Sequence, residues 1–226
     1  AQSLAVPPAS ARIDRGRFRR SANPQSGAAA MPMYHNGNRE LQARFGATQL
    51  ADRLVERLWR NRFKDEDKAF IESAGFFFLA TADGDGAPDC SFKGGPPGFV
   101  HIAAPDLLLF PDYDGNGMFK SLGNIQVNPQ VGMLFITLGE KPQRLRVNGR
   151  ASLHFDDPAI GAFPGAQLIV RVTPEHIFPN CPRYVPDLGT GTPSDYLPAA
   201  GTTPKEPAWK QFDAFKDVVP PRRSTP

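Results

Sequence analysis

The stretch that decides the fold is FPDYDGNGMFKSLGNIQVNPQVGMLF, residues 110–135. Its polar, glycine-bearing segment at residues 112–117 predicts a turn. A short helix is expected to follow from about Met118 to Val127. Asn128-Pro129 ends that helix, because a residue before proline disfavours the α conformation. Apolar segments on either side, at residues 107–110 and 131–138, predict strands. The stretch therefore places one short helix between two strands.

Outward from this stretch, the sequence reads mainly as strands separated by short turns. Residues 144–154 alternate between apolar or small side chains and polar ones, which is typical of a strand with one buried face. Asp83-Gly84-Asp85-Gly86 predicts a hairpin turn. About seven strands with one internal helix favour a closed or nearly closed barrel in the mainly β (α+β) class. The predicted strands cover residues 76–81, 89–93, 99–103, 107–110, 131–138, 144–154 and 168–178.

The chain divides into four predicted segments. Residues 1–33, rich in Ala, Ser, Pro and Arg, are expected to be a disordered basic tail, either an organelle leader or an N-terminal extension ahead of a start near Met31 or Met33. Residues 34–74 are expected to form peripheral N-terminal helices, with one helix beginning at an Asp65 N-cap. Residues 75–180 form the barrel. Residues 181–226 are a proline-rich arm, either loose or wrapped over a partner subunit.

Composition and charge exclude several classes of protein. The formal net charge of the 226 residues is +3, but five arginines and one aspartate give residues 1–33 a charge of +4. The remaining residues carry a net charge of −1, so they lack the excess positive charge that is typical of nucleic-acid-binding proteins. Two cysteines exclude a disulfide scaffold and a four-cysteine zinc site, and we expect no metal. The longest apolar runs are too short to cross a membrane. A cytoplasmic location is the default expectation, because the sequence shows no export signal and its two cysteines, in separate motifs, need not be bonded.

Two stretches have residues suited to bind a ligand. Lys120 and Ser121 enter the short helix after Gly115-Asn116-Gly117, and free backbone N–H groups beside a lysine and a hydroxyl suit a phosphate. The alternative is an ordinary capped helix with a solvated lysine. In the second stretch, a strand ending in Ser91 and Lys93 precedes Gly94-Gly95, where a flat group could approach the backbone closely. The alternative for Lys93 is an ordinary surface lysine.

Other side chains favour plainer interpretations. Cys90 reads as a structural thiol rather than a nucleophile. The row Arg144, Arg146 and Arg150 is usually a solvated face, but an arginine of a strand lining a ligand groove could bind a phosphate or an anionic ring oxygen. The four histidines form no pair at metal-ligand spacing.

The sequence resembles the pyridoxamine 5'-phosphate oxidase-like superfamily of FMN-binding split barrels, particularly a bacterial subgroup of oxidase-related flavin proteins. The resemblance extends from about Tyr34 to the C-terminus. It is carried by FFFLATADGDGAPDCSFKGG at residues 76–95, by residues 110–135, by RLRVNGRA at residues 144–151 and by FPNCPRY at residues 178–184.

The resemblance implies a six-stranded split barrel that works as a homodimer with two FMN molecules at the subunit interface. Aligned on Asn128-Pro129, Lys120 takes the place of the family's phosphate-binding arginine and Ser121 that of its lysine. The phosphate site therefore carries less charge than in the oxidases, and their C-terminal Arg-Leu-His substrate segment has no clear counterpart. The implied FMN-binding residues are Cys90, Ser91, Phe92, Lys93, Asn116, Lys120, Ser121 and Arg144.

These features favour an FMN-dependent oxidoreductase acting on an unidentified small molecule. In such a scheme FMN carries the redox chemistry, so no residue is assigned as an acid–base catalyst. The alternative is a non-catalytic binding or carrier protein for flavin, deazaflavin or haem, whose axial ligand would have to be His101, His154 or His176. A third hypothesis gives the basic tail a nucleic acid or an acidic membrane as partner.

Overall fold

The computed structural model describes residues 33–139, 141–186 and 206–220. The predicted basic tail, residues 1–33, lies outside these ranges except for Met33. Large parts of the predicted arm at residues 181–226 lie outside them as well.

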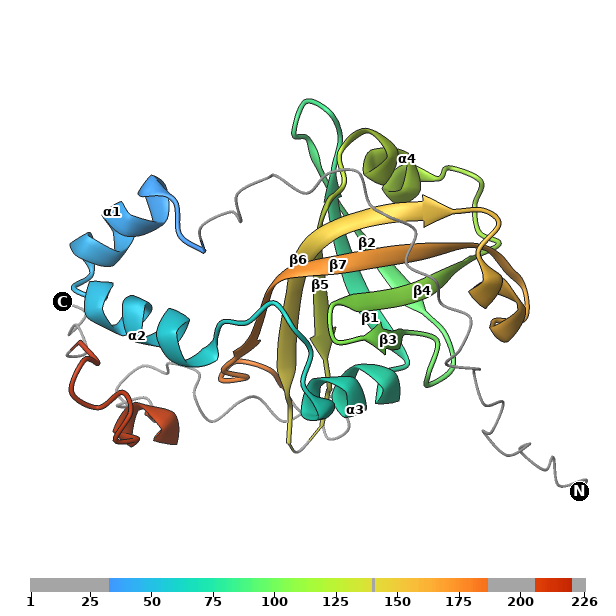
Figure 1. Cartoon of the computed structure of the whole chain (residues 1–226). Helices are drawn as coiled ribbons and strands as arrows, with labels where there is room; N and C mark the ends of the chain where they lie inside the picture. The colour runs from blue at the N-terminus through green and yellow to red at the C-terminus, as the bar shows by residue number, and fades with distance from the viewer. Residues whose placement is uncertain (1–32, 140, 187–205, 221–226) are drawn as a thin grey trace, which may run out of the picture. The chain divides into compact units, whose positions relative to one another are not determined.

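The described residues form one antiparallel sheet of seven strands in the order β2-β1-β5-β6-β7-β4-β3 (Figure 1). The end strands β2 and β3 are not paired with each other, so the barrel is open between them. This arrangement confirms the mainly β split-barrel prediction, with seven strands where the resemblance implied six. The strands are β1 (Phe76–Ala82), β2 (Pro88–Gly94), β3 (His101–Ala104), β4 (Leu107–Tyr113), β5 (Gln130–Ile136), β6 (Arg144–His154) and β7 (Ala166–Asn180).

The sheet curls around an aromatic core. Phe77 of β1 is fully buried, and its ring centroid lies 5.0 Å from that of Phe110 on β4 and 5.2 Å from that of Phe135 on β5. The ring of Phe99, which precedes β3, stacks on that of Phe77 with the two centroids 5.9 Å apart. Because these rings come from both ends and the middle of the sheet, their burial is what bends it into a barrel.

Strands β6 and β7 are antiparallel neighbours in the sheet. Their register shifts between Asn148 and Gly149. A Cβ added at Gly149 would lie 2.2 Å from the carbonyl oxygen of Thr173, so only glycine leaves room for the neighbouring backbone. A bulge of this kind increases the local bend of a strand, as closure of a barrel requires.

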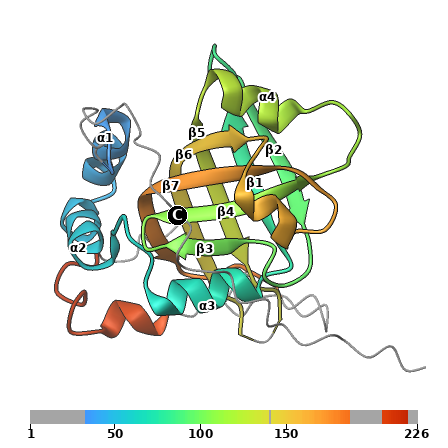
Figure 2. The same cartoon turned by 45° about the vertical axis from the view of Figure 1, so that its right-hand side comes forward.

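Two helices lie at opposite ends of the barrel (Figure 2). Helix α3 (Asp65–Ser73) buries Ile71, and its N-cap is Lys64 rather than the predicted Asp65. Helix α4 (Lys120–Val127) buries Leu122 and Ile125. The side-chain amide of Asn124 donates to Thr81 Oγ1 on β1 at 3.0 Å, a buried hydrogen bond that fixes α4 over the sheet.

The helices α1 (Asn36–Arg44) and α2 (Thr48–Leu58) precede the barrel. Trp59 Nε1 donates to His176 Nδ1 of β7 at 2.5 Å, and Arg60 exchanges backbone hydrogen bonds with Ile177. Arg53 of α2 donates to the carbonyl of Ala214, which follows η2 (Ala208–Gln211). No helix within the described ranges is long and apolar enough to cross a membrane.

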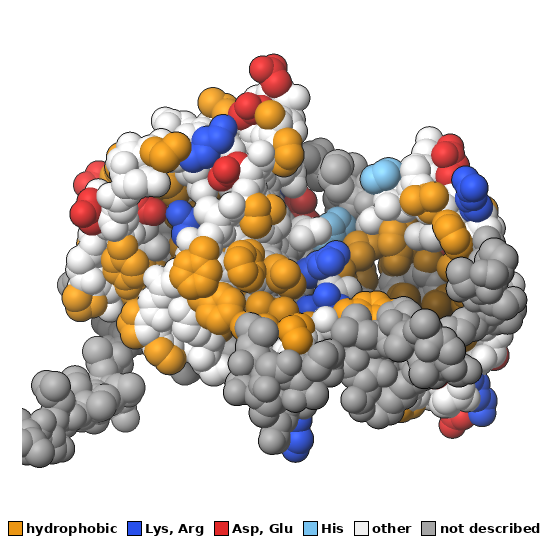
Figure 3. Space-filling view, turned by 180° about the vertical axis from the view of Figure 1, so that it is seen from behind, with side chains coloured by type: hydrophobic (Ala, Val, Ile, Leu, Met, Phe, Trp, Pro, Cys, Tyr) orange, Lys and Arg blue, Asp and Glu red, His pale blue; other side chains and the backbone are white. Residues whose placement is uncertain are grey.

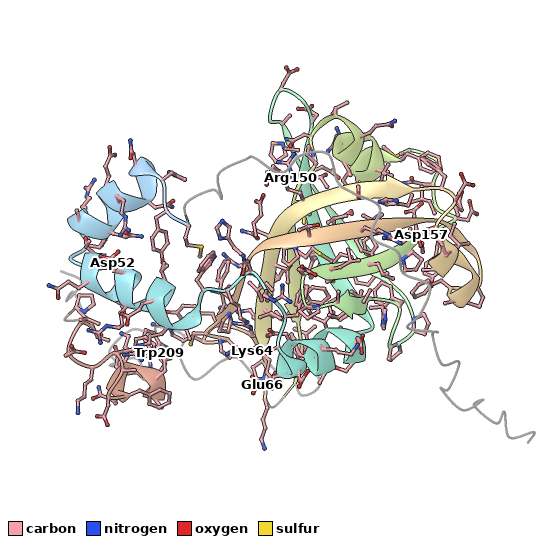
Figure 4. The ribbon with its side chains drawn as sticks, in the orientation of Figure 1. Asp52, Lys64, Glu66, Arg150, Asp157 and Trp209 are labelled. Carbon is pink, nitrogen blue, oxygen red and sulfur yellow. The ribbon has the colours of Figure 1, made fainter. Side chains whose placement is uncertain are left out.

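The short helix η1 (Pro158–Ala162) is held by a buried carboxylate. Asp157 Oδ1 accepts from the backbone N–H of Ala159 at 2.8 Å, and its Oδ2 accepts from Arg171 Nε of β7 at 2.6 Å (Figure 4). Burial alone would raise the pKa of Asp157, but these hydrogen bonds, together with the charges of Arg171 and His154, outweigh it and lower the pKa below its ordinary value.

Candidate functional site

Edge strand β2 presents three polar side chains on its inner face. Asp89, Ser91 and Lys93 alternate along the strand and are half-buried. They pair with Thr81, Leu79 and Phe77 of β1, whose side chains are buried in the barrel. Because cross-strand partners point to the same side of a sheet, the three polar groups face inward near the open edge.

The loop from β4 enters α4 through a strained residue. Phe119, the N-cap, has φ 48° and ψ 27°, a left-handed conformation that a bulky side chain rarely adopts. It makes no side-chain cap hydrogen bond, so N–H groups of the first turn stay available to an anion. The Asn116 Oδ1 atom accepts from the backbone N–H of Met118 at 3.0 Å, which shapes the turn.

Strand β2, the end of β4 and the start of α4 enclose a cavity of about 420 Å³. Both cationic groups of the lining are lysines, one on β2 and one at the first residue of α4. The lining consists of Asp89, Ser91, Phe92, Lys93, Asp112, Tyr113, Asp114, Gly115, Asn116, Gly117, Met118, Phe119, Lys120, Ser121 and Leu122.

A pair of hydroxyls links β2 to α4. Ser91 Oγ lies 2.9 Å from Ser121 Oγ, and Ser121 Oγ donates to Asp89 Oδ2 at 3.5 Å. Ser121 is buried, whereas Lys120 beside it is exposed. Of the two residues predicted to hold a phosphate, Lys120 is therefore the freer to reach one.

Asp112 is a buried carboxylate at the end of β4. Its Oδ1 lies 3.9 Å from the Lys93 ammonium nitrogen. Burial raises the pKa of Asp112, and the charge of Lys93 opposes that rise. Within the described ranges, no group of three or more His, Cys, Asp or Glu residues is arranged to hold a metal ion.

The cavity brings together six of the eight residues predicted to bind a cofactor: Ser91, Phe92, Lys93, Asn116, Lys120 and Ser121. Cys90 is exposed on the opposite face of β2. Arg144 lies at the start of β6, outside the cavity, where its guanidinium donates to the carbonyl of Cys181. Neither of these two residues lines the cavity.

Asp89 and Asp112 also line the cavity, although neither was among the residues predicted to bind a ligand. Asp89 shares the period-two spacing of Ser91 and Lys93. Asp112 ends an apolar strand directly before a glycine turn. Both features of the sequence could have indicated cavity-lining residues, since polar residues on the inner face of a barrel strand need a polar partner.

The close approach predicted at Gly94-Gly95 is made by the protein's own rings. A Cβ at Gly94 would lie 2.8 Å from Phe92 Cε1, and one at Gly95 would lie 2.6 Å from Phe99 Cγ. Here the flat groups that the glycines accommodate are phenylalanine side chains.

The outer face of β1 and β2 is aromatic and exposed. The rings of Phe76 and Phe92 stack at 5.3 Å, and Phe78 meets Phe92 edge-on at 6.1 Å. Phe92 is 63% exposed. In the view from behind, hydrophobic side chains extend across the middle of the molecule, and Lys or Arg side chains lie beside them (Figure 3).

The family model described as pyridoxamine 5'-phosphate oxidase matches residues 63–181, more than half of the chain. That range contains every strand described above and the whole cavity lining. No curated protein matches the chain significantly.

Several solved structures are similar to this chain. HupZ of Group A Streptococcus is 18% identical, over 58% of this chain and 98% of its own, with a TM-score of 0.42. The heme storage protein HutZ of Vibrio cholerae is 20% identical, over 50% and 90%, with a TM-score of 0.36. An FMN-binding protein from Syntrophomonas wolfei is 12% identical, over 63% and 97%, with a TM-score of 0.38. At these values the likenesses assign no ligand to this chain.

Proposed function

The chain belongs to the pyridoxamine 5'-phosphate oxidase family, and on that premise we propose that its cavity binds FMN and that the protein is an FMN-dependent oxidoreductase acting on a small molecule. The observation that carries the proposal is the cavity itself, in which the free start of α4, Lys120, and the polar inner face of β2 converge.

The residues present fit such a ligand. A volume of about 420 Å³ lies within the range of small-molecule sites. The exposed ammonium of Lys120 and the uncapped first turn of α4 form an anion site of the kind that holds phosphates. Ser91 and Lys93 continue the polar lining along β2, away from α4.

Each of these groups has a distinct task in the proposal. Lys120 and the first-turn N–H groups hold the phosphate. Ser121, fixed by Ser91 and Asp89, maintains the spacing between α4 and β2. Ser91 and Lys93 lie along the chain or the ring of the ligand, beyond its phosphate. Bound FMN would supply hydride acceptance and onward electron transfer, which leaves binding and orientation to the protein.

We also propose that two copies associate through the outer face of β1 and β2. The half-buried ring of Phe76 and the exposed rings of Phe78 and Phe92 support this, because a contiguous aromatic patch on a single subunit commonly marks an interface. Arg144 lies on the outer side of the same sheet. A two-fold arrangement would allow it to serve the cavity of the other copy.

The binding proposal is tested on the purified protein by its visible absorption spectrum and by fluorescence titration with FMN. Lys120→Ala is expected to weaken FMN binding roughly ten- to a hundredfold, because it removes a charge-assisted contact worth about 1.5–3 kcal/mol. Lys216→Ala, which breaks an exposed ion pair with Asp213, is the matched control and should change nothing. Failure of the wild-type protein to bind FMN would overturn the proposal.

Catalysis and association each have their own measurement. Reduction of the bound flavin by NAD(P)H or by a substrate supports the enzyme, whereas tight binding without turnover supports the carrier alternative. Phe92→Asp should convert a dimer to a monomer in light scattering. Phe155→Asp, at a residue that is 64% exposed, is the control. A monomeric wild-type protein would contradict the association proposal.

A further inference from the structure

Asp112 is placed to face the cavity rather than solvent. On β4 it continues the alternation of Leu108 and Phe110, whose side chains belong to the barrel core. The register between β4 and β7 shifts between Asp112 and Tyr113. A bulge at a strand end commonly re-aims a side chain. The result is a carboxylate that is only 9% exposed and that lines the cavity.

This carboxylate has little to satisfy it among the described residues. The interaction found there is the ion pair with Lys93 at 3.9 Å, which is too long for a hydrogen bond. By contrast, Asp89 accepts from Ser121 and Asp157 accepts two hydrogen bonds. The Asp112 oxygens open on the cavity rather than being sealed from solvent. A ligand that displaces water from them must supply hydrogen-bond donors in its place, because a carboxylate stripped of donors is costly.

The position of Asp112 relative to α4 restricts which part of a ligand it meets. Ser91 contacts Ser121 in the first turn of α4, so the phosphate end of the cavity adjoins Ser91. Lys93, the partner of Asp112, lies two residues further along β2, about 7 Å away. A phosphate beside Asp112 would be repelled. The ligand portion next to the phosphate must therefore bear hydrogen-bond donors.

We propose that Asp112 selects ligands with a hydroxyl-bearing chain, by accepting hydrogen bonds from the chain hydroxyls while Lys93 balances its charge. The inference rests on the proposed function, in which that chain is the ribityl group of FMN. Asp112 is thus a specificity residue for the part of the ligand between the phosphate and the ring.

The test compares three flavins by fluorescence titration of the full chain freed of bound ligand. FMN has phosphate and hydroxyls, riboflavin has hydroxyls alone, and lumiflavin has neither. Asp112→Ala should weaken FMN and riboflavin by the same factor, roughly ten- to a hundredfold, and leave lumiflavin unchanged. Asp112→Asn, which keeps an acceptor oxygen, should lie between wild type and Asp112→Ala. The control Asp85→Ala removes an exposed carboxylate of the turn between β1 and β2, outside the cavity lining, and should leave all three affinities unchanged.

The outcomes separate this inference from the function on which it rests. If the wild-type protein binds none of the three flavins, the proposed function fails. If it binds FMN but Asp112→Ala and Asp112→Asn leave FMN and riboflavin unchanged, only the assignment of Asp112 fails. An equal loss for lumiflavin would also overturn it, because the carboxylate would then act on the ring or on the fold. Circular dichroism and melting of each variant establish that the folded protein is being titrated.

Discussion

Two glycine-to-alanine substitutions should change stability in opposite directions, because their surroundings differ. At Gly149 an added Cβ would lie 2.2 Å from Thr173 O and 3.0 Å from Pro174 Cα. All these atoms belong to the backbone of β7, so no side-chain rotation relieves the clash. At Gly123, on the exposed side of α4, an added Cβ meets nothing within 4 Å.

The magnitudes follow from these contacts. Overpacking a tightly packed site costs up to about 3 kcal/mol, and a backbone clash belongs at that upper end. For a chain of this size, such a loss lowers the melting temperature by about 6–12 °C. In Gly123→Ala the helix gains about 1 kcal/mol of propensity, which should raise the melting temperature by about 2–4 °C.

The measurement is urea unfolding followed by circular dichroism, at one protein concentration so that association does not bias the comparison. Gly149→Ala should unfold at lower urea and Gly123→Ala at higher urea than the wild type. A Gly149→Ala protein within 1 kcal/mol of the wild type would refute the argument, because β6 and β7 would then have room to separate. Shifts of the same sign in both variants would refute the inference that the space around the added Cβ decides whether alanine stabilises or destabilises the protein.

Three further predictions concern the core and two titratable groups. Phe77→Ala should lower the free energy of unfolding by about 3–5 kcal/mol in urea titration, because it empties the centre of the aromatic core. The pKa of Asp157 is lowered, so its contribution is present above its unfolded pKa and lost as pH falls through the folded one. Asp157→Asn should therefore destabilise the protein at neutral pH and cease to matter in strong acid, as urea midpoints across pH would show. Burial lowers the pKa of His101, although Glu72 raises it. The wild type should therefore lose stability as pH falls below about 6.5, and a His101→Gln variant should lose less in the same titration.

The strands were predictable because a strand with one buried face alternates apolar and polar residues along the sequence. Residues 144–154 were expected as a strand and form β6 with the same bounds. The start of α4 was not predictable. A helix from Met118 was expected, but Phe119 takes a left-handed conformation and the helix begins at Lys120. Phenylalanine carries no sequence signal for that conformation, which tertiary contacts impose.

The site was partly predictable for a similar reason. Ser91 and Lys93 were found because they end a strand beside two glycines, and alternation from them leads to Asp89. Gly94 and Gly95 were expected to let a flat ligand approach the backbone, but they make room for Phe92 and Phe99 instead. Local sequence could not show this, because these rings come close only after the chain has folded. Arg144 could not be placed either. Its distance from the cavity depends on the order of strands in the sheet, which sequence periodicity does not specify.

The charges of the cavity explain why the chain between phosphate and ring matters for recognition. Three carboxylates line it, against the two lysines. Asp89 is engaged by Ser121, and Lys93 is committed to Asp112. Lys120 is then the lysine left for a phosphate, and it is exposed, where a charged contact is weakened by solvent. A site with so little spare positive charge gains selectivity from its carboxylate acceptors instead, since a carboxylate that loses its water on binding discriminates against every ligand that brings it no donor.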